Sequence, residues 1–286
     1  LTVDNHCDGP YLYLRMLREG HPRAEEVLRL LEMNGGNSSG IGIGCVSWDG
    51  QVHADQFWRH YSFGNVRERP FGEIWTDTSD ELMGKLKDRK PHLKAEARED
   101  FAEGELSTSD ILRVATDIRA AGDPIVILTG GEPLVRPDFF EIAGKCTRLF
   151  TRVALATNGT LVDEALAGRI VDTGIQRVSI SLDGARAETH DTFRGMAGSF
   201  DAALGGFDAL KRAGASLQVN VTVTRQNDAE MEDLLRLCLD RGADAFHIFM
   251  LVPVGCGAQL SDDVRLSPEQ FESRLVWLFE KSVELA

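Results

Sequence analysis

The chain has 286 residues, of which 43% are hydrophobic and 27% charged, as expected for a soluble globular protein with one large or two ordinary domains. Its formal net charge of −14 argues against nucleic acid or an anionic membrane as a partner, because either would need a basic face. No apolar run approaches the roughly 20 residues that cross a bilayer. The first ten residues are too polar for a signal peptide, so we expect a cytoplasmic protein.

Residues 1–94 combine short helices with one hairpin. Amphipathic patterns predict helices over residues 9–20, 21–36 and 69–86, and Asp49-Gly50 suits the turn of a hairpin with arms at 40–46 and 51–55. The stretch 90–105 is charged and aperiodic, which is typical of a linker. We therefore predict a small α+β domain over residues 1–94 and a second domain over residues 95–286.

The second domain alternates helices with apolar strands. Strands are predicted at 124–130, 152–159, 177–184, 216–224 and 245–255, and helices at 104–122, 137–150, 162–174, 199–214, 228–242 and 267–286. Near-continuous apolar strands between helices are typical of a parallel sheet covered by helices. Because the series begins with a helix, its first strand is absent. A partial (β/α)6 barrel fits best, and an open doubly wound sheet is the second possibility.

Five cysteines are scattered along the chain: Cys7, Cys45, Cys146, Cys238 and Cys256. Their number is odd, their spacing is wide and no C-x-x-C occurs, so they do not form a disulfide framework. Cys146 and Cys238 stand in apolar helical surroundings and are expected to be buried thiols.

Small polar residues stand at the carboxyl ends of the predicted strands, where a parallel barrel binds its ligands. They lie in Thr129–Glu132, Thr157–Gly159, Ser181–Gly184 and Asn220–Thr222, and the last strand ends in Pro253-Val254-Gly255. Asn, Asp and Gly also form turns after strands. That explanation does not cover the sequence Gly-Gly-Glu, nor a serine and an asparagine inside strands.

Gly130, Gly131 and Glu132 suggest a ligand with an ammonium group. Two glycines let a ligand approach the backbone closely, and the glutamate that follows offers an acceptor. Arg194 could bind a carboxylate of the same ligand, which together suits the zwitterionic end of an amino acid. The alternative for Arg194 is a surface salt bridge.

The segments LTGGEPLVRPDFFEIA, ATNGTLVDEAL, RVSISLDGARAETHDTFRGMAGSF and NVTVTRQN, in this order, resemble the radical S-adenosylmethionine (SAM) enzymes. The resemblance covers residues 100–286. It implies that Gly130, Gly131, Glu132 and Pro133 line the methionine end of SAM, Asn158 and Ser181 the ribose, Arg194 the carboxylate and Leu251–Pro253 the adenine. Thr157, Asp183 and Asn220 complete the implied SAM-binding set. It also implies [4Fe-4S] clusters and an electron donor such as flavodoxin or ferredoxin.

The segment GIGCVSWDGQVHADQFWRHYSFGNVRERPFGEIW resembles the C-terminal auxiliary-cluster (SPASM or Twitch) region of the same superfamily. It is similar to the proteins of d1-haem and alternative haem biosynthesis, which act on sirohaem-derived tetrapyrroles. The resemblance makes Cys45 the leading cluster ligand and Cys7 a second candidate; otherwise Cys7 is a free thiol. His53 is expected to be a surface or hydrogen-bonded histidine. Arg67 and Arg69 could meet tetrapyrrole carboxylates or lie on a solvated hairpin surface.

The chain departs from the family in two ways. Its segment order is reversed, since the auxiliary region precedes the barrel, and it lacks both the C-x-x-x-C-x-x-C and the C-x-x-C…C cysteine groups that hold the clusters. The cluster segments exist outside this sequence, or the chain is a circular permutant from which they were removed, or it is a cluster-less relative. We favour the first two, because the missing parts fall at one junction.

The resemblance implies a function in tetrapyrrole biosynthesis. A reduced cluster would cleave SAM, and a 5′-deoxyadenosyl radical would take a hydrogen atom from the substrate. We expect an enzyme of the d1-haem branch that removes propionate side chains from a sirohaem-derived substrate. The alternatives are a decarboxylase or deacetylase of the alternative haem pathway, a peptide-modifying radical SAM protein, and a cluster-less module that binds SAM or a tetrapyrrole.

Overall fold

The computed structural model describes residues 2–3, 17–18, 20, 23–25, 29, 40–55, 61–87, 106–251 and 264–285. The chain forms two compact units, one made of residues 1–4 and 123–286 and the other of residues 5–122. The predicted boundary between residues 94 and 95 lies outside the described residues and stays a prediction. The helix that begins after the linker belongs to the second of these units rather than to the barrel-like one.

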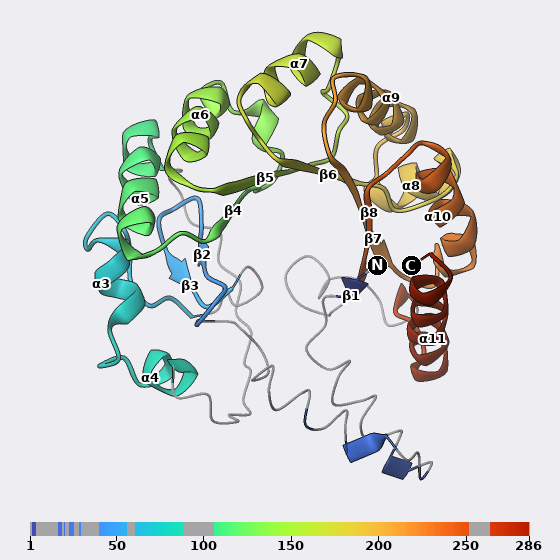
Figure 1. Ribbon diagram of the computed structural model, residues 1–286, viewed down its shortest axis with the longest axis horizontal. Coiled ribbons are helices and arrows are strands. Elements are labelled where there is room, and N and C mark those ends of the chain that lie inside the picture. The colour runs from blue at the N-terminus through green and yellow to red at the C-terminus, as the bar shows by residue number, and fades with distance from the viewer. Residues whose placement is uncertain are drawn as a thin grey trace. The chain divides into compact units, whose positions relative to one another are not determined.

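The barrel-like unit contains a parallel sheet in the order β1-β8-β7-β6-β5-β4 (Figure 1). Its strands are β1 (Thr2–Val3), β4 (Ile125–Leu128), β5 (Arg152–Thr157), β6 (Arg177–Ser181), β7 (Leu217–Val223) and β8 (Ala245–Met250). The five predicted strands are confirmed, and from β4 to β8 the neighbours follow chain order. β1 was not predicted, because two residues carry no periodic signal. It pairs with β8, with Thr2 opposite His247.

Helices follow the strands of this sheet. They are α6 (Phe139–Leu149), α7 (Glu164–Asp172), α8 (Ala187–Arg194), α9 (Ser199–Arg212), α10 (Met231–Asp240) and α11 (Pro268–Glu284), with short 3-10 turns at Pro133–Val135 (η1) and Asp228–Glu230 (η2). The predicted helices are confirmed, and the architecture is a partial (β/α) barrel. α8 was not predicted: it is a polar helix in which only His190 is buried, so it shows no apolar stripe.

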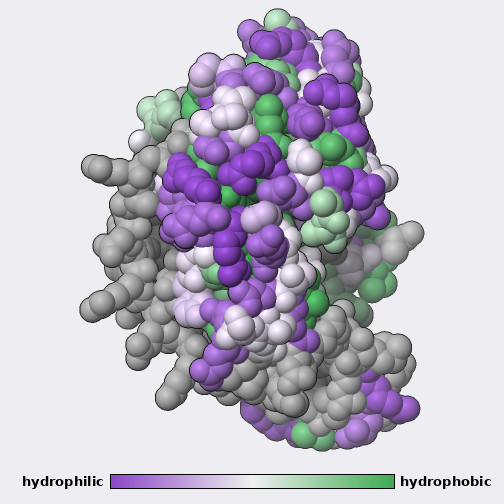
Figure 2. Space-filling view, turned by 90° about the vertical axis from the view of Figure 1, so that its left-hand side faces the viewer, coloured by the Kyte–Doolittle hydropathy of each residue, from purple (hydrophilic) through white to green (hydrophobic). Residues whose placement is uncertain are grey.

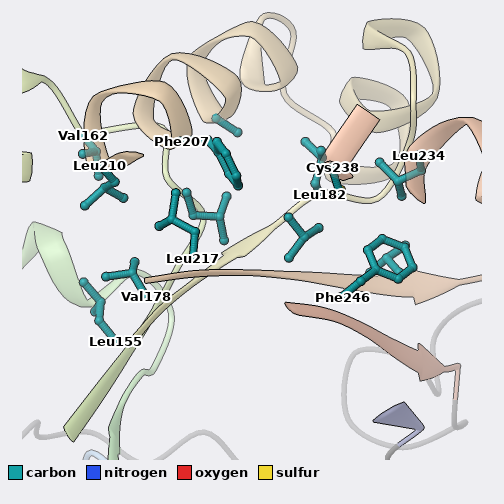
Figure 3. Close-up of a cluster of buried hydrophobic side chains, with 14 of the residues drawn as sticks. Leu155, Val162, Val178, Leu182, Phe207, Leu210, Leu217, Leu234, Cys238 and Phe246 are labelled. Atoms are coloured by element: carbon teal, nitrogen blue, oxygen red, sulfur yellow. The ribbon is translucent and has the colours of Figure 1, made fainter. Parts of the chain in front are cut away.

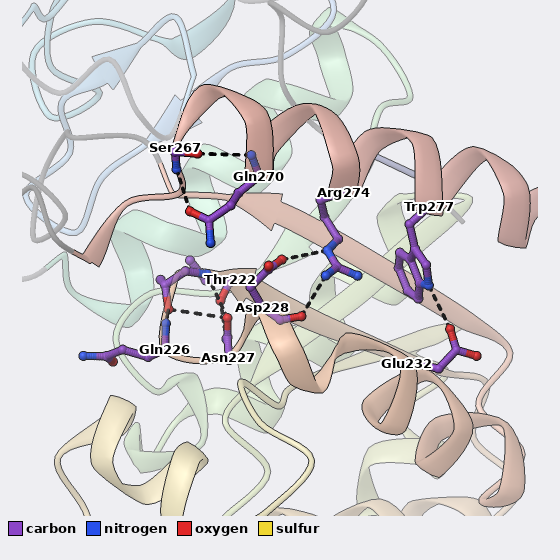
Figure 4. Close-up of polar contacts among 10 residues, drawn as sticks. Thr222, Gln226, Asn227, Asp228, Glu232, Ser267, Gln270, Arg274 and Trp277 are labelled. Carbon is purple, nitrogen blue, oxygen red and sulfur yellow. Dashed lines mark hydrogen bonds and ion pairs between the residues drawn. The ribbon is translucent and has the colours of Figure 1, made fainter.

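Polar contacts fix the last helix to the rest of the unit (Figure 4). Ser267 and Gln270 form a capping box that starts α11. Farther along α11, Arg274 donates to a carboxylate oxygen and to the carbonyl oxygen of Asp228, both at 2.8 Å. The indole nitrogen of Trp277 donates to Glu232 at 2.8 Å. α11 is therefore held to η2 and α10 by side chains rather than by sheet contacts alone.

One face of the sheet forms the hydrophobic core (Figure 3). Alternate residues of adjacent strands, such as Leu155, Val178 and Leu217, are fully buried. They belong to one cluster with Leu210 of α9 and Leu234 of α10. Burying each such leucine or valine contributes about 1.5–3 kcal/mol to stability. This face therefore holds the helices on the sheet, and the opposite face is not part of this core.

The described residues of the other unit include the hairpin and the helices α3 to α5. β2 (Cys45–Val46) and β3 (Val52–His53) are antiparallel around the predicted Asp49-Gly50 turn, and Gly50 has a φ of +87°. The strands are shorter than the predicted arms. The unit also contains α3 (Phe71–Thr76), α4 (Glu81–Lys87) and α5 (Thr108–Ala121).

One expectation for this unit changes. The helix predicted over 69–86 is two helices, because Asp77 accepts the Ser79 N–H at 3.1 Å and Asp80 accepts the Met83 N–H at 2.9 Å, which ends one helix and starts the next. The helix predicted over 104–122 is confirmed as α5, which is capped by Ser107, and Val114 on it is buried in one cluster with Phe71 and Ile74 of α3. The helices predicted over 9–20 and 21–36 fall mostly outside the described residues.

The surface is largely hydrophilic on the face drawn in Figure 2, where apolar residues are dispersed among polar ones. Among the described helices, none combines the length and apolarity that crossing a bilayer would require.

Candidate functional site

On the central strands, the face of the sheet opposite the core carries mostly small and polar side chains. On β6, β7 and β8 these residues are Ser179, Ser181, Gln218, Asn220, Thr222 and His247, and most of them are half-buried. The edge strand β4 adds the exposed Ile125 and Ile127 to this face, and β8 adds Phe249. The register aligns Ser181 with Asn220, and Asn220 with His247, in one row. A filled barrel carries layers of Val, Ile and Leu here. This composition instead suits the binding of a polar ligand.

Gly130 and Gly131 form an open stretch of backbone where β4 ends. Both are exposed, and a Cβ added to either one would meet no atom within 4 Å. Gly130 has a φ of +155°, which favours glycine. Pro133 then starts η1. A ligand at this edge can therefore reach backbone N–H and C=O groups directly.

Glu132 connects the ends of β4 and β5. Its Oε1 accepts the Leu134 N–H at 3.1 Å and the Thr157 hydroxyl at 2.8 Å, and its Oε2 accepts the Asn158 N–H at 2.7 Å. Thr157 is buried, and its hydroxyl oxygen also accepts the Gly159 N–H at 3.1 Å. Glu132 therefore serves as a clamp that holds the two loops together, a role that the sequence did not suggest. Its predicted contact with an ammonium group stays a prediction.

Asp183 and Arg194 meet beyond the end of β6. Asp183 is fully buried; its Oδ1 accepts the Thr222 N–H at 2.8 Å, and its Oδ2 accepts the Arg194 Nε–H at 2.6 Å. The Arg194 side chain is 34% exposed. The salt bridge considered as the alternative exists, but with a buried partner rather than a surface one. It orients the guanidinium and leaves part of it accessible to a ligand.

Further buried polar residues, which sequence analysis missed, support this loop. His190 is 2% exposed, and its Nδ1 accepts the Asp183 N–H at 3.0 Å. Burial is the main cause that lowers the pKa of His190 below its ordinary value. Asn227, also buried, donates to the Asp183 carbonyl at 2.8 Å. A polar helix and a buried asparagine give no periodic signal, so these residues could be found only from the three-dimensional arrangement.

The remaining predicted residues lie elsewhere. Leu251 follows β8 and is half-buried, whereas Pro253 and Cys7 fall outside the described residues. Cys45 belongs to the other unit, where it stands opposite His53 in the hairpin. His53 is buried, and its Nδ1 lies 2.7 Å from the Tyr61 carbonyl oxygen, as expected for a hydrogen-bonded histidine.

The described residues do not fit an iron–sulfur cluster. No group of three or more His, Cys, Asp or Glu side chains among them is arranged to hold a metal. Burial raises the pKa of the Cys146 thiol to about 11 and that of Cys238 to about 12, so both stay protonated, whereas a cluster needs thiolates. Cys146 and Cys238 are core residues, as predicted.

The sequence profile of the Radical SAM superfamily matches residues 87–238, more than half of the chain. The chain belongs to this superfamily. The family implies SAM and a [4Fe-4S] cluster. The open backbone at Gly130 and Gly131, the polar row across β6–β8 and the oriented Arg194 fit SAM. The cluster does not fit the residues that the structure describes.

Three relatives connect this radical SAM chain with haem-type cofactors. It is 78% identical to Fe-coproporphyrin III synthase of Methanosarcina barkeri over 97 residues; this stretch makes up 34% of this chain and 24% of that protein. It is 42% identical over 193 residues to AdoMet-dependent heme synthase of the same organism, 68% of this chain and 54% of that protein. Pre-heme d1 synthase of Dinoroseobacter shibae is 40% identical over 154 residues, 54% of this chain and 38% of that protein. The chain spans about half, or less, of the length of each of these relatives.

Proposed function

We propose that the protein is a radical SAM enzyme of haem biosynthesis that modifies side chains of an iron tetrapyrrole. The observation that carries the proposal is the open Gly130–Gly131 backbone at the edge of a polar sheet face. Carboxyl ends of parallel strands are where such folds bind their ligands, and the radical SAM profile covers this region.

The residues of the edge divide into ligand-binding and supporting groups. The backbone at Gly130 and Gly131 faces the methionine ammonium, and Arg194 binds the methionine carboxylate. Ser181 and Asn158 bind the ribose, with Asn220 beside Ser181 in the sheet, and Leu251 with Pro253 covers the adenine. The supporting group consists of Glu132, Pro133, Thr157 and Asp183, of which Glu132 and Asp183 hold the loops through the contacts described above.

SAM supplies a 5′-deoxyadenosyl radical in this family, and the cluster that generates the radical needs cysteines that the described residues do not provide. Cys45, and Cys7 with it, stay candidates for an auxiliary cluster. An electron donor such as flavodoxin or ferredoxin is then the expected protein partner.

The names of the relatives favour the haem branch over the d1-haem branch. Two of the three act, by name, as synthases of Fe-coproporphyrin III or haem, and one of these is 78% identical over its matched stretch. The pre-heme d1 synthase keeps the removal of propionate groups in d1-haem formation as a second candidate.

The test is anaerobic turnover with matched variants. Turnover needs the cluster-binding cysteines that this sequence lacks, so the assay uses the protein together with the segments that carry them. After anaerobic reconstitution with iron and sulfide, that protein with SAM, dithionite and a sirohaem-derived tetrapyrrole should release 5′-deoxyadenosine, and the tetrapyrrole product identifies the branch. Arg194→Lys should weaken SAM binding by about tenfold, since lysine cannot form the same bidentate contact. Arg212→Lys is the control, because Arg212 is exposed on α9 and pairs with Glu164. Equal SAM affinity in wild type and Arg194→Lys would argue against the assigned SAM orientation. Absence of tetrapyrrole turnover in a protein that carries its iron–sulfur cluster would argue against the function.

A further inference from the structure

Glu230 is a buried carboxylate that holds the beginning of helix α8. It is the last residue of η2, and its side chain is 8% exposed. Its Oε2 accepts the Ala185 N–H at 2.8 Å, and its Oε1 accepts the Thr189 hydroxyl at 2.5 Å. The Arg186 Nε lies 3.4 Å from Oε1. Arg186 is the N-cap of α8 and has no acceptor on its side chain, so Glu230 supplies the acceptors that the cap itself lacks.

The same segment of the chain also fixes the loop that precedes α8. Asn227 stands three residues before Glu230 and is fully buried. Its side-chain nitrogen donates to the carbonyl oxygens of Asp183 and Thr222, both at 2.8 Å. One short stretch after β7 therefore contacts both the loop after β6 and the start of the helix that follows this loop.

Arg194 completes this set of contacts at the other end of α8. It is the last residue of the helix, and its Nε–H donates to Asp183 Oδ2 at 2.6 Å. In between, Asp191 accepts the Phe200 N–H at 2.8 Å, which joins α8 to the helix that follows it in the chain. α8 has eight residues, a length of about 12 Å, and a single buried side chain. Polar contacts rather than apolar packing therefore determine where it lies, and Glu230 provides those at its first turn.

We propose that Glu230 is a positioning residue for SAM: by holding the start of α8, it determines where Arg194 presents its guanidinium to the methionine carboxylate. This inference rests on the proposed function, in which Arg194 binds that carboxylate. Glu230 contacts the opposite end of the helix, so it acts on the ligand only through α8. A binding group has to be held within about 0.5 Å of its productive position by its supporting contacts. Loss of the buried acceptor should therefore weaken SAM binding.

The experiment compares two ligands that differ only in the carboxylate, SAM and decarboxylated SAM. Calorimetry measures both affinities for wild type, Glu230→Gln and Thr189→Val in the full chain. Glu230→Gln keeps the shape of the side chain but removes its charge and one acceptor oxygen, and Thr189→Val removes the hydroxyl donor on α8. Glu188→Gln is the matched control, because it makes the same change of charge at an exposed position of the same helix.

The inference predicts a loss confined to the ligand that carries the carboxylate. Glu230→Gln should bind SAM about fivefold more weakly, with unchanged affinity for decarboxylated SAM. Thr189→Val should show a smaller loss of the same kind, and Glu188→Gln should match wild type. In Arg194→Lys, adding Glu230→Gln should cause no further loss of SAM affinity, because the two residues act through one contact. A purely structural role would lower the affinity for both ligands alike.

Three results would overturn the inference: wild-type SAM affinity in Glu230→Gln, equal losses for the two ligands, or a further loss in Arg194→Lys as large as that in wild type. If Glu230→Gln does not fold, the same criteria apply to Thr189→Val. If wild type binds both ligands equally, the assigned contact between Arg194 and the SAM carboxylate fails together with this inference. If Arg194→Lys loses the preference for SAM while Glu230→Gln keeps it, only the role of Glu230 fails.

Discussion

Gly206 lets helix α9 lie directly on the turn that follows β5, and replacing it with alanine should disturb that turn. A Cβ at position 206 would lie 2.2 Å from the Gly159 carbonyl oxygen and 3.1 Å from the Val162 Cβ. The first contact is with backbone, so α9 or the turn must move by about 1 Å. Overpacking of this kind costs about 1–3 kcal/mol, and alanine in a helix returns about 0.5–1 kcal/mol. We expect a net loss of about 1–2 kcal/mol.

The neighbouring glycine provides the control. Gly205 is exposed on the same helix, and a Cβ there would meet no atom within 4 Å. Thermal unfolding should show Gly205→Ala slightly more stable than wild type. Gly206→Ala should melt several degrees lower, since about 1 kcal/mol shifts Tm by about 2–4 °C in a domain of this size. SAM affinity should fall only in Gly206→Ala, because Gly159 follows Asn158 in the clamped loop. Equal melting temperatures for the two variants would refute the packing argument.

Three further predictions concern the polar contacts around the site. Glu132→Gln should destabilise the protein by about 2–4 kcal/mol in urea unfolding, because the amide cannot accept all three hydrogen bonds and bonds to a charged group contribute about 1.5–3 kcal/mol each. The control Glu280→Gln, at an exposed position, should leave the free energy of unfolding unchanged. Unchanged stability with lost SAM binding in Glu132→Gln would instead make Glu132 a direct ligand. Asp183→Asn should cost about 1.5–3 kcal/mol, because an amide in this buried position cannot accept both the Thr222 N–H and the Arg194 Nε–H as the carboxylate does. A loss below about 1 kcal/mol would contradict this role. The lowered pKa of His190 means that the unfolded chain binds a proton more readily than the native protein. The free energy of unfolding should therefore fall as the pH drops below about 6.5, by up to about 1.4 kcal/mol per pH unit. In His190→Asn, the urea midpoint should change less between about pH 7.5 and 5.5 than in wild type.

Local patterns predicted the elements that bury one face. The runs at β4 to β8 and the helices between them have clear periodicity, and caps such as Ser107 and Ser267 are visible as single residues. β1 could not be predicted, because two residues gain strand structure only by pairing with β8. α8 could not be predicted either, because polar contacts rather than an apolar stripe stabilise it. It ends at Gly195, which has a φ of +66°.

The SAM-binding role of the candidate site stays a prediction, drawn from the motif that contains Gly130 and Gly131 and from Arg194. The structure adds the contacts of the residues around it. Glu132 and Asp183 are ordinary acidic residues in the sequence, and only the fold shows that chain hydrogen bonds hold their carboxylates. Gln218 and His247 alternate with buried apolar neighbours, but sequence analysis treated these strands as near-continuous apolar runs, so it predicted neither residue nor their contact.

The most direct test of the SAM site is the SAM affinity of Gly131→Ala compared with wild type, by calorimetry under anaerobic conditions. A Cβ at position 131 meets no protein atom within 4 Å, so the substitution should leave thermal stability unchanged. If the open backbone binds SAM, the added methyl group should occupy ligand space and weaken binding by about tenfold or more, about 1.4 kcal/mol. SAM affinity equal to that of wild type in a stably folded Gly131→Ala, or a wild type that does not bind SAM, would contradict the account.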